Sequence, residues 1–152
     1  MTTNGPEGAD LKTAVFHFQR GQFDAAEPTL RALAAQDDPR AMYFLGGICR
    51  MRDRDEAAAR RWFTRGASLG NAQCMFEVGT SFLAEADFDS ARLWLERAAA
   101  AGVVSAMLNL GSALINSGNR EGARTWWQRA AKEGNATEKD LAKRILSAYF
   151  PS

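Results

Sequence analysis

A motif that recurs every 32 residues limits this chain to a small group of folds. In each copy, a glycine inside an apolar run is followed by Ala-x-x-Trp and then by a closing glycine. The alanines, tryptophans and closing glycines each recur at exact 32-residue intervals, at Ala59, Ala91 and Ala123, at Trp62, Trp94 and Trp126, and at Gly70, Gly102 and Gly134. A fixed period of this length is typical of stacked supersecondary units that bury their apolar faces against one another. The sequence therefore predicts a repeat protein.

Each copy predicts two amphipathic helices joined by a short turn. In the third copy, Met75, Val78, Gly79 and Phe82 follow the helical spacing of i, i+3, i+4 and i+7. Asp55, Asp87 and Asn119 each stand four residues before the repeated alanine, where a short polar side chain can cap the second helix. The closing glycines predict left-handed helix ends. Because short turns force antiparallel packing, we expect each copy to be a helical hairpin.

The spacing of the first-helix glycines locates one irregularity. Gly46 and Gly79 lie 33 residues apart, whereas Gly79 and Gly111 lie 32 apart. The copy that begins near residue 39 therefore carries one extra residue in the turn between its helices.

The motif also sets the expected boundaries. We predict an all-α, right-handed superhelix of four helix-turn-helix repeats, at about 9–38, 39–71, 72–103 and 104–135, within a single domain over 9–150. A capping helix is expected at about 137–149, starting at Thr137 and Asp140, and a flexible lead-in at 1–8. In the degenerate first copy, Phe23 begins a helix that should end near Ala35, with Asp24 and Glu27 as a capping box.

Large apolar and sulfur-containing residues are assigned to the core. The periodic tryptophans repeat too regularly for a lone binding site, so we predict that they are buried, together with Trp127 and its equivalents Phe63 and Leu95. Cys49 and Cys74 occupy register positions held by apolar or small residues in the other copies, which favours packing over metal or disulfide chemistry.

Charge and composition restrict the class of partner. Among 152 residues, 46% are hydrophobic and 24% charged, and 19 basic residues nearly balance 18 acidic ones. A formal charge of +1 argues against nucleic acid or an anionic membrane as a partner. No leader-like start and no bilayer-long apolar run is visible, so a cytoplasmic protein is expected.

An arginine-rich stretch at 40–65 holds seven arginines and three acids. Arg52 and Arg54, in the turn with the extra residue, are candidates for a basic dock that takes an acidic or phosphorylated partner. A solvated helix face with interleaved acids is the alternative reading.

The sequence contains no recognisable set of catalytic residues. His17 is the only histidine and occupies the register position of Cys49, Phe82 and Leu114. No serine, histidine and acid set, metal-ligand spacing or phosphate-binding glycine loop occurs. We therefore expect neither an enzyme nor a cofactor.

The pairs Leu45-Gly46, Val78-Gly79 and Leu110-Gly111, with the Ala-x-x-Trp motifs and closing glycines, resemble the Sel1-like subclass of tetratricopeptide repeats. The resemblance covers about Arg40 to Asn135, and 9–38 is more generally tetratricopeptide-like. It departs from the Sel1-like pattern in lacking the longer glycine-rich turn between the helices.

The resemblance implies a bacterial-type adaptor whose first helices line a concave groove for a partner peptide or helix. The groove residues it implies are Tyr43, Arg50, Gln73, Phe76, Thr80, Leu83, Leu108, Ser112, Ile115 and Asn116. Packing between adjacent first helices is a competing use for Phe76, Leu83 and Leu108.

Two other functions stay open at this point. A sensor of a short peptide or small molecule would use the same groove. A homo-oligomeric structural module would use exposed ends of the stack, either the first hairpin or the helix over Leu141–Tyr149.

Overall fold

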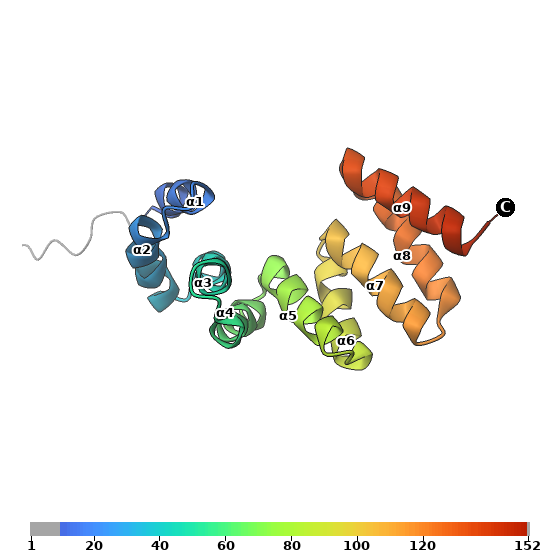
Figure 1. Cartoon of the computed structure of the whole chain (residues 1–152), viewed down its shortest axis with the longest axis horizontal. Coiled ribbons are helices and arrows are strands. Elements are labelled where there is room, and N and C mark those ends of the chain that lie inside the picture. Colours follow the sequence, from blue (N-terminus) through green and yellow to red (C-terminus); the bar gives the residue numbers. More distant parts are fainter. Residues whose placement is uncertain (1–9, 152) are drawn as a thin grey trace, which may run out of the picture. The chain divides into compact units, whose positions relative to one another are not determined.

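A computed structural model of the chain describes residues 10–151, which form nine α-helices and no β-strand. The helices are α1 (Leu11–Gln19), α2 (Phe23–Ala35), α3 (Pro39–Met51), α4 (Glu56–Ser68), α5 (Ala72–Ala84), α6 (Phe88–Ala100), α7 (Val104–Asn116), α8 (Arg120–Glu133) and α9 (Ala136–Tyr149). Consecutive helices are joined by short turns and follow one another through the chain (Figure 1). The prediction of an all-α helical-repeat fold is confirmed. The lead-in expected at 1–8 lies outside the described residues.

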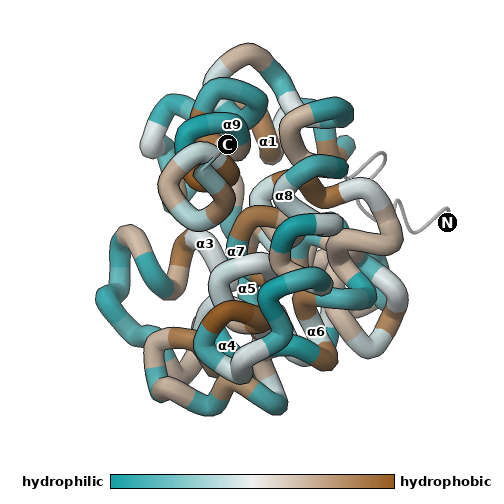
Figure 2. The backbone as a smooth tube through the Cα atoms, turned by 90° about the vertical axis from the view of Figure 1, so that its right-hand side faces the viewer, coloured by the Kyte–Doolittle hydropathy of each residue, from teal (hydrophilic) through white to brown (hydrophobic). Residues whose placement is uncertain are grey.

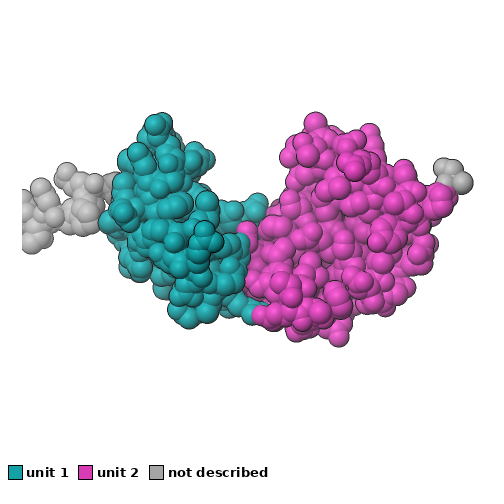
Figure 3. All heavy atoms as spheres, in the orientation of Figure 1, with its two compact units in different colours: residues 1–74 teal, residues 75–152 magenta. Residues whose placement is uncertain are grey.

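The chain divides into two compact units, residues 1–74 and 75–152 (Figure 3). Unit 1 holds α1 to α4 and the first turn of α5, and unit 2 holds the rest of α5 and α6 to α9. Each interval expected to be one repeat contains one pair of helices, and α9 follows the last pair. The single domain over 9–150 and the hand of the superhelix stay predictions.

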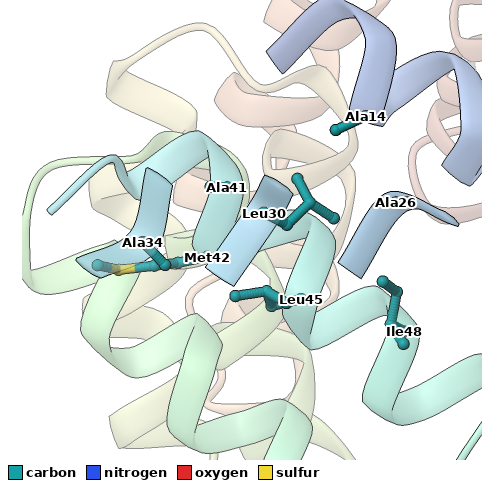
Figure 4. Close-up of a cluster of buried hydrophobic side chains, with 8 residues drawn as sticks. All are labelled: Ala14, Ala26, Leu30, Ala34, Ala41, Met42, Leu45 and Ile48. Atoms are coloured by element: carbon teal, nitrogen blue, oxygen red, sulfur yellow. The ribbon is translucent and has the colours of Figure 1, made fainter. Parts of the chain in front are cut away.

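The first three helices of unit 1 share a cluster of buried small and medium apolar side chains. The cluster consists of Ala14, Ala26, Leu30, Ala34, Ala41, Met42, Leu45 and Ile48, each at most 1% exposed (Figure 4). Alanines on facing helices allow the backbones to approach closely, and the leucine, isoleucine and methionine side chains fill the space between them. Trp62 of α4 packs against this cluster only partly buried.

In each of the three regular hairpins, a first-helix glycine faces a large side chain of the second helix. Phe63 lies against Gly46, Leu95 against Gly79 and Trp127 against Gly111, and a Cβ added at any of these glycines would overlap the facing side chain. These glycines therefore allow the two helices of each hairpin to pack closely. Only glycine fits at these three positions, because every other residue carries a Cβ that would overlap the facing side chain.

These contacts correct the assignment of the periodic tryptophans to the core. Phe63, Leu95 and Trp127 are at most 1% exposed, whereas the preceding tryptophans, Trp62, Trp94 and Trp126, are only half-buried. Adjacent helical positions point about 100° apart, so only one of the two residues can face the first-helix glycine directly. The residue after each periodic tryptophan occupies the centre of the hairpin.

The polar residues before the second helices act as expected. Asp55, Asp87 and Asn119 each accept a hydrogen bond from the backbone N–H three residues on, at 2.8, 3.1 and 2.9 Å. The three predicted N-caps are therefore confirmed. The extra residue is also where the spacing placed it, because the turn from α3 to α4 spans 52–55 whereas its two later counterparts span 85–87 and 117–119.

The closing glycines differ among the copies. Gly70 and Gly102 are left-handed, with φ of +89° and +91°. Gly134 is not, since its φ is −67° and its ψ is 169°. The chain there enters α9 directly through a capping box made by Asn135 and Glu138, so the predicted start at Thr137 and Asp140 is wrong.

The capping box predicted in the first copy is also wrong. The residue before α2 is Gln22, which makes no side-chain capping hydrogen bond. Asp24 and Glu27 lie within the first turns of α2 and bind an arginine from another hairpin instead.

Candidate functional site

The first helices of unit 2 carry most of the residues implied for partner binding. On α5, Phe76, Thr80 and Leu83 are half-buried. The Thr80 hydroxyl lies 2.8 Å from the carbonyl oxygen of Phe76 and 3.0 Å from that of Glu77. Its single hydrogen is therefore used within α5, and its oxygen keeps the capacity to accept a further bond.

On α7, one of the implied residues is not accessible. Leu108 is only 8% exposed and belongs to the core of unit 2, so its assignment as a binding anchor is wrong. Helix α7 packs against both α6 and α8, which buries more of its circumference than a single stripe. Ile115 is half-buried and lies between the exposed Ser112 and Asn116.

The polar groups of α7 are also partly used within the helix. The Ser112 hydroxyl lies 3.3 Å from the Leu108 carbonyl, and the Asn116 amide nitrogen donates to the Ser112 carbonyl at 3.1 Å. The Ser112 hydroxyl oxygen and the Asn116 side-chain carbonyl remain as acceptors. Helix α7 therefore presents one apolar side chain between two hydrogen-bond acceptors.

In unit 1, Tyr43 and Arg50 of α3 both pack over Phe63. The Tyr43 ring centroid lies 6.1 Å from that of Phe63, and the Arg50 guanidinium carbon lies 4.9 Å from it. Arg50 also pairs with Glu56 at 2.8 Å and, by this hydrogen bond, lowers the pKa of the Glu56 carboxyl. Arg50 thus has a packing role in addition to any role towards a partner. Gln73, at the start of α5, is exposed.

The two arginines of the suggested basic dock have different surroundings. The Arg52 guanidinium contacts Asp24 at 2.9 Å, Glu27 at 2.7 Å and Asp53 at 2.6 Å. Hydrogen bonds to Asp53 and Glu27 raise the pKa of Arg52. This side chain ties α2 to the turn after α3. Arg54 is exposed, sits at a left-handed φ of +53°, and makes no ion pair within residues 10–151.

Glu27 is the best-shielded acid of this network, with its side chain 18% exposed. Burial by itself raises its pKa, but hydrogen bonds from Arg52 and Arg31 outweigh burial, so the net pKa is lowered. A sequence reading missed this network because Asp24 and Glu27 lie more than 20 residues from Arg52.

Hydrophobic and hydrophilic residues are interspersed along the helices (Figure 2). Among the described helices, none is long and apolar enough to cross a membrane.

The sequence pattern of one known family, described as the tetratricopeptide repeat, matches residues 12–72 and 76–137. The first match covers nearly all of α1 to α4 and the second covers nearly all of α5 to α8. The chain belongs to the tetratricopeptide repeat family. Tetratricopeptide repeats generally mediate protein–protein interactions. No curated protein matches the chain significantly, and the Sel1-like subclass stays a prediction.

Two of the periodic tryptophans of these tetratricopeptide repeats contact an arginine of the same helix, which was not predicted from the sequence. An arginine follows each tryptophan by three residues, at Arg65, Arg97 and Arg129. The Arg97 guanidinium lies over Trp94 at 5.3 Å, and that of Arg129 lies over Trp126 at 5.4 Å. Arg65 instead pairs with Asp37 of the preceding hairpin at 2.7 Å. The Trp-x-x-Arg spacing could have predicted these contacts between arginine and tryptophan, because residues i and i+3 are neighbours on a helix.

The histidine and cysteines of the tetratricopeptide repeats lie in packed surroundings. His17 is half-buried, with its Nδ1 2.8 Å from the Gln22 side-chain oxygen. Burial and the nearby charge of Asp53 raise the pKa of the Cys49 thiol, which disfavours the reactive thiolate. Cys74 is fully buried, and its sulfur lies against Gly66. The prediction that Cys74 is a close-packing residue is confirmed, whereas Cys49 is half-buried rather than fully buried.

Proposed function

We propose that this chain binds a partner protein and that helices α5 and α7 of unit 2 supply the contact surface. The observation that carries the proposal is the surface of α7, where the half-buried Ile115 lies between the exposed Ser112 and Asn116. An apolar side chain flanked by polar groups suits recognition of a peptide or helix, because the first gives affinity and the others give specificity. Membership of a family that generally mediates protein–protein interactions supports this assignment.

The hydrogen bonds inside the helices specify the chemistry of the partner. Thr80 and Ser112 direct their hydroxyl groups at carbonyls of their own helices, and Asn116 uses one amide hydrogen in the same way. What they retain is mainly acceptor capacity. The matching segment would therefore present an apolar side chain together with N–H or O–H donors.

Phe76, Leu83 and Ile115 are the apolar anchors of the proposed surface, and Thr80, Ser112 and Asn116 are its polar contacts. Leu108 is excluded because it is buried. Tyr43, Arg50 and Gln73 belong to unit 1, and we propose that they serve as a separate contact area of that unit.

The test compares capture of proteins from a lysate of the source cell by the wild type and by Phe76→Ala/Ile115→Ala. Leu93→Ala is the matched control, because Leu93 is 50% exposed but lies on the second helix α6. Circular dichroism first establishes that all three proteins are equally helical.

A partner retained by the wild type and the control but lost by the double variant supports the proposal. With that partner purified, we expect at least tenfold weaker binding for the double variant, because two central apolar anchors are truncated and an anchor of this kind costs more than about 1 kcal/mol. Equal capture by all three proteins would place the binding surface elsewhere.

A further inference from the structure

A pocket at the C-terminal end of unit 2 is not used by the proposed function. It has a volume of about 360 Å³ and lies between α8 and the end of α9, which pack side by side (Figure 1). Its lining residues are Arg124, Gln128, Leu146, Ser147, Phe150 and Pro151. A volume of this size is at the lower end of the range for ligand sites, about 300–1,000 Å³. It suits a single side chain better than a large ligand.

The lining of this pocket has a net positive charge. Arg124 is its one charged residue, and no acidic side chain lines it. The Arg124 guanidinium carbon lies 5.3 Å from the centre of the Phe150 ring, and that of Arg120 lies 5.1 Å from the same ring. Two cations therefore meet at one aromatic side chain, which favours the approach of an anion.

The two arginines differ in what holds them. Arg120 donates a 2.8 Å hydrogen bond to the Tyr149 carbonyl at the end of α9. Arg124 makes no hydrogen bond or ion pair with any of residues 10–151, although its guanidinium carries five N–H donors. The contact of the guanidinium with the Phe150 ring uses none of those donors, so Arg124 can bind a carboxylate through two parallel bonds.

The rest of the lining suggests what accompanies the carboxylate. Leu146, Phe150 and Pro151 provide apolar contacts, while Gln128 and Ser147 provide neutral hydrogen-bonding groups. Arg124, Gln128, Ser147 and Pro151 are all exposed, so the pocket is shallow. A small free anion would keep much of its hydration there, whereas a side chain held by a longer peptide would gain contacts on both sides of the pocket.

We propose that this pocket binds an aspartate or glutamate side chain, next to an apolar residue, in an acidic segment of a partner protein. The contact is separate from the α5 and α7 surface and does not depend on it.

The probe is the peptide acetyl-Gly-Phe-Glu-Gly-amide, compared with the same peptide carrying glutamine in place of glutamate. Binding to the full chain is followed by NMR, from the Arg124 side-chain Nε–H and the backbone amides of residues 146–150. One anchored side chain should give a dissociation constant on the order of 1 mM, so peptide is added to about 10 mM. We expect saturable shifts with the glutamate peptide and at least fivefold weaker binding of the glutamine peptide.

Three variants locate the contact. Arg124→Gln should weaken binding at least fivefold. Arg144→Gln should not, because Arg144 on α9 has a side chain 76% exposed and lies outside the pocket lining. Ser147→Asp places a competing carboxylate beside Arg124 and should also weaken binding.

Several results would overturn the proposal. These are the absence of shifts at the highest peptide concentration, equal binding of the two peptides, unchanged binding by Arg124→Gln, and an equal loss with Arg144→Gln, which would indicate only general charge attraction. In the last measurement, sodium acetate replaces the peptide. If acetate alone produces the same shifts at the same concentration, the site takes free small anions and the assignment to a peptide is wrong.

Discussion

The indole nitrogen of Trp127 donates a 3.0 Å hydrogen bond to the backbone carbonyl of Leu108. Trp127 belongs to α8 and is 1% exposed, and Leu108 belongs to α7. The indole can reach the α7 backbone because Gly111, one turn further along α7, has no Cβ in its way. Hydrogen bonding and close packing thus fix these two helices at the same point.

Replacing this glycine tests the close packing directly. We expect Gly111→Ala to destabilise the chain by about 1–3 kcal/mol, because the added methyl group overlaps the Trp127 indole and forces one helix to move. This cost should outweigh the gain of up to about 1 kcal/mol that alanine brings to a helix. Urea unfolding followed by circular dichroism measures the difference. Ser112→Ala, at the exposed neighbouring position, should stay within about 0.5 kcal/mol of the wild type. A neutral Gly111→Ala would mean that α7 and α8 are not in close contact here.

Alanine substitutions at Phe63 and Trp62 test which of these two adjacent residues belongs to the core. Phe63 is 1% exposed, so Phe63→Ala should cost about 3–5 kcal/mol, as expected for truncation of a buried aromatic side chain. Trp62 is only half-buried, and Trp62→Ala should cost less although tryptophan is larger. Denaturant unfolding of the two variants gives the order. A larger loss for Trp62→Ala would restore the original assignment of the periodic tryptophans to the core.

Removal of one N-cap should produce a smaller, local loss. The Asn119 side chain accepts a hydrogen bond from the Gly122 N–H at 2.9 Å, at the start of α8. Asn119→Ala leaves that donor without its cap and should cost about 1 kcal/mol. The control is Thr125→Ala, an exposed position inside α8 where alanine favours the helix. Equal stabilities of the two variants, measured by thermal unfolding, would show that the cap contributes nothing.

The ion pair between Arg50 and Glu56 predicts a dependence of stability on pH. The hydrogen bond from Arg50 lowers the pKa of Glu56 in the folded chain, so the unfolded chain takes up this proton at a higher pH than the folded chain does. The stabilisation is therefore fully present above the ordinary glutamate pKa of about 4.3 and is lost as the pH falls through the lowered folded pKa. The pKa of Asp38 is lowered in the same way by its hydrogen bond from Arg40.

Urea midpoints of the wild type and Glu56→Gln between pH 7 and pH 3 measure this effect. The difference between the two proteins should be constant down to about pH 4.5 and then shrink, because protonated glutamate and glutamine are nearly equivalent. The Glu56 side chain is 60% exposed, so salt at about 1 M should reduce the difference at pH 7. A difference that stays unchanged to pH 3 would contradict the assigned pair.

Local signals account for the parts of the fold that were predictable. An N-cap such as Asp87 acts on a backbone N–H three residues away, and a helical hairpin requires only an apolar stripe and a short turn. These interactions lie within one repeat, so the 32-residue period was enough to find them. The same reasoning misjudged Gly134, because its conformation depends on how soon the next helix begins.

The 32-residue period and the capping residues were enough to predict consecutive helical hairpins, most of the helix starts and a resemblance to a family of protein-binding repeats. The packing of the helices sets which residue of each adjacent pair is buried, with Trp127 and Phe63 inside and Trp126 and Trp62 at the edge. The same packing buries Leu108 and brings Asp24 and Glu27 to Arg52. The physical reason is that burial and ion pairing depend on contacts between helices distant in sequence, whereas helix caps and periodicity act within a few residues of the chain.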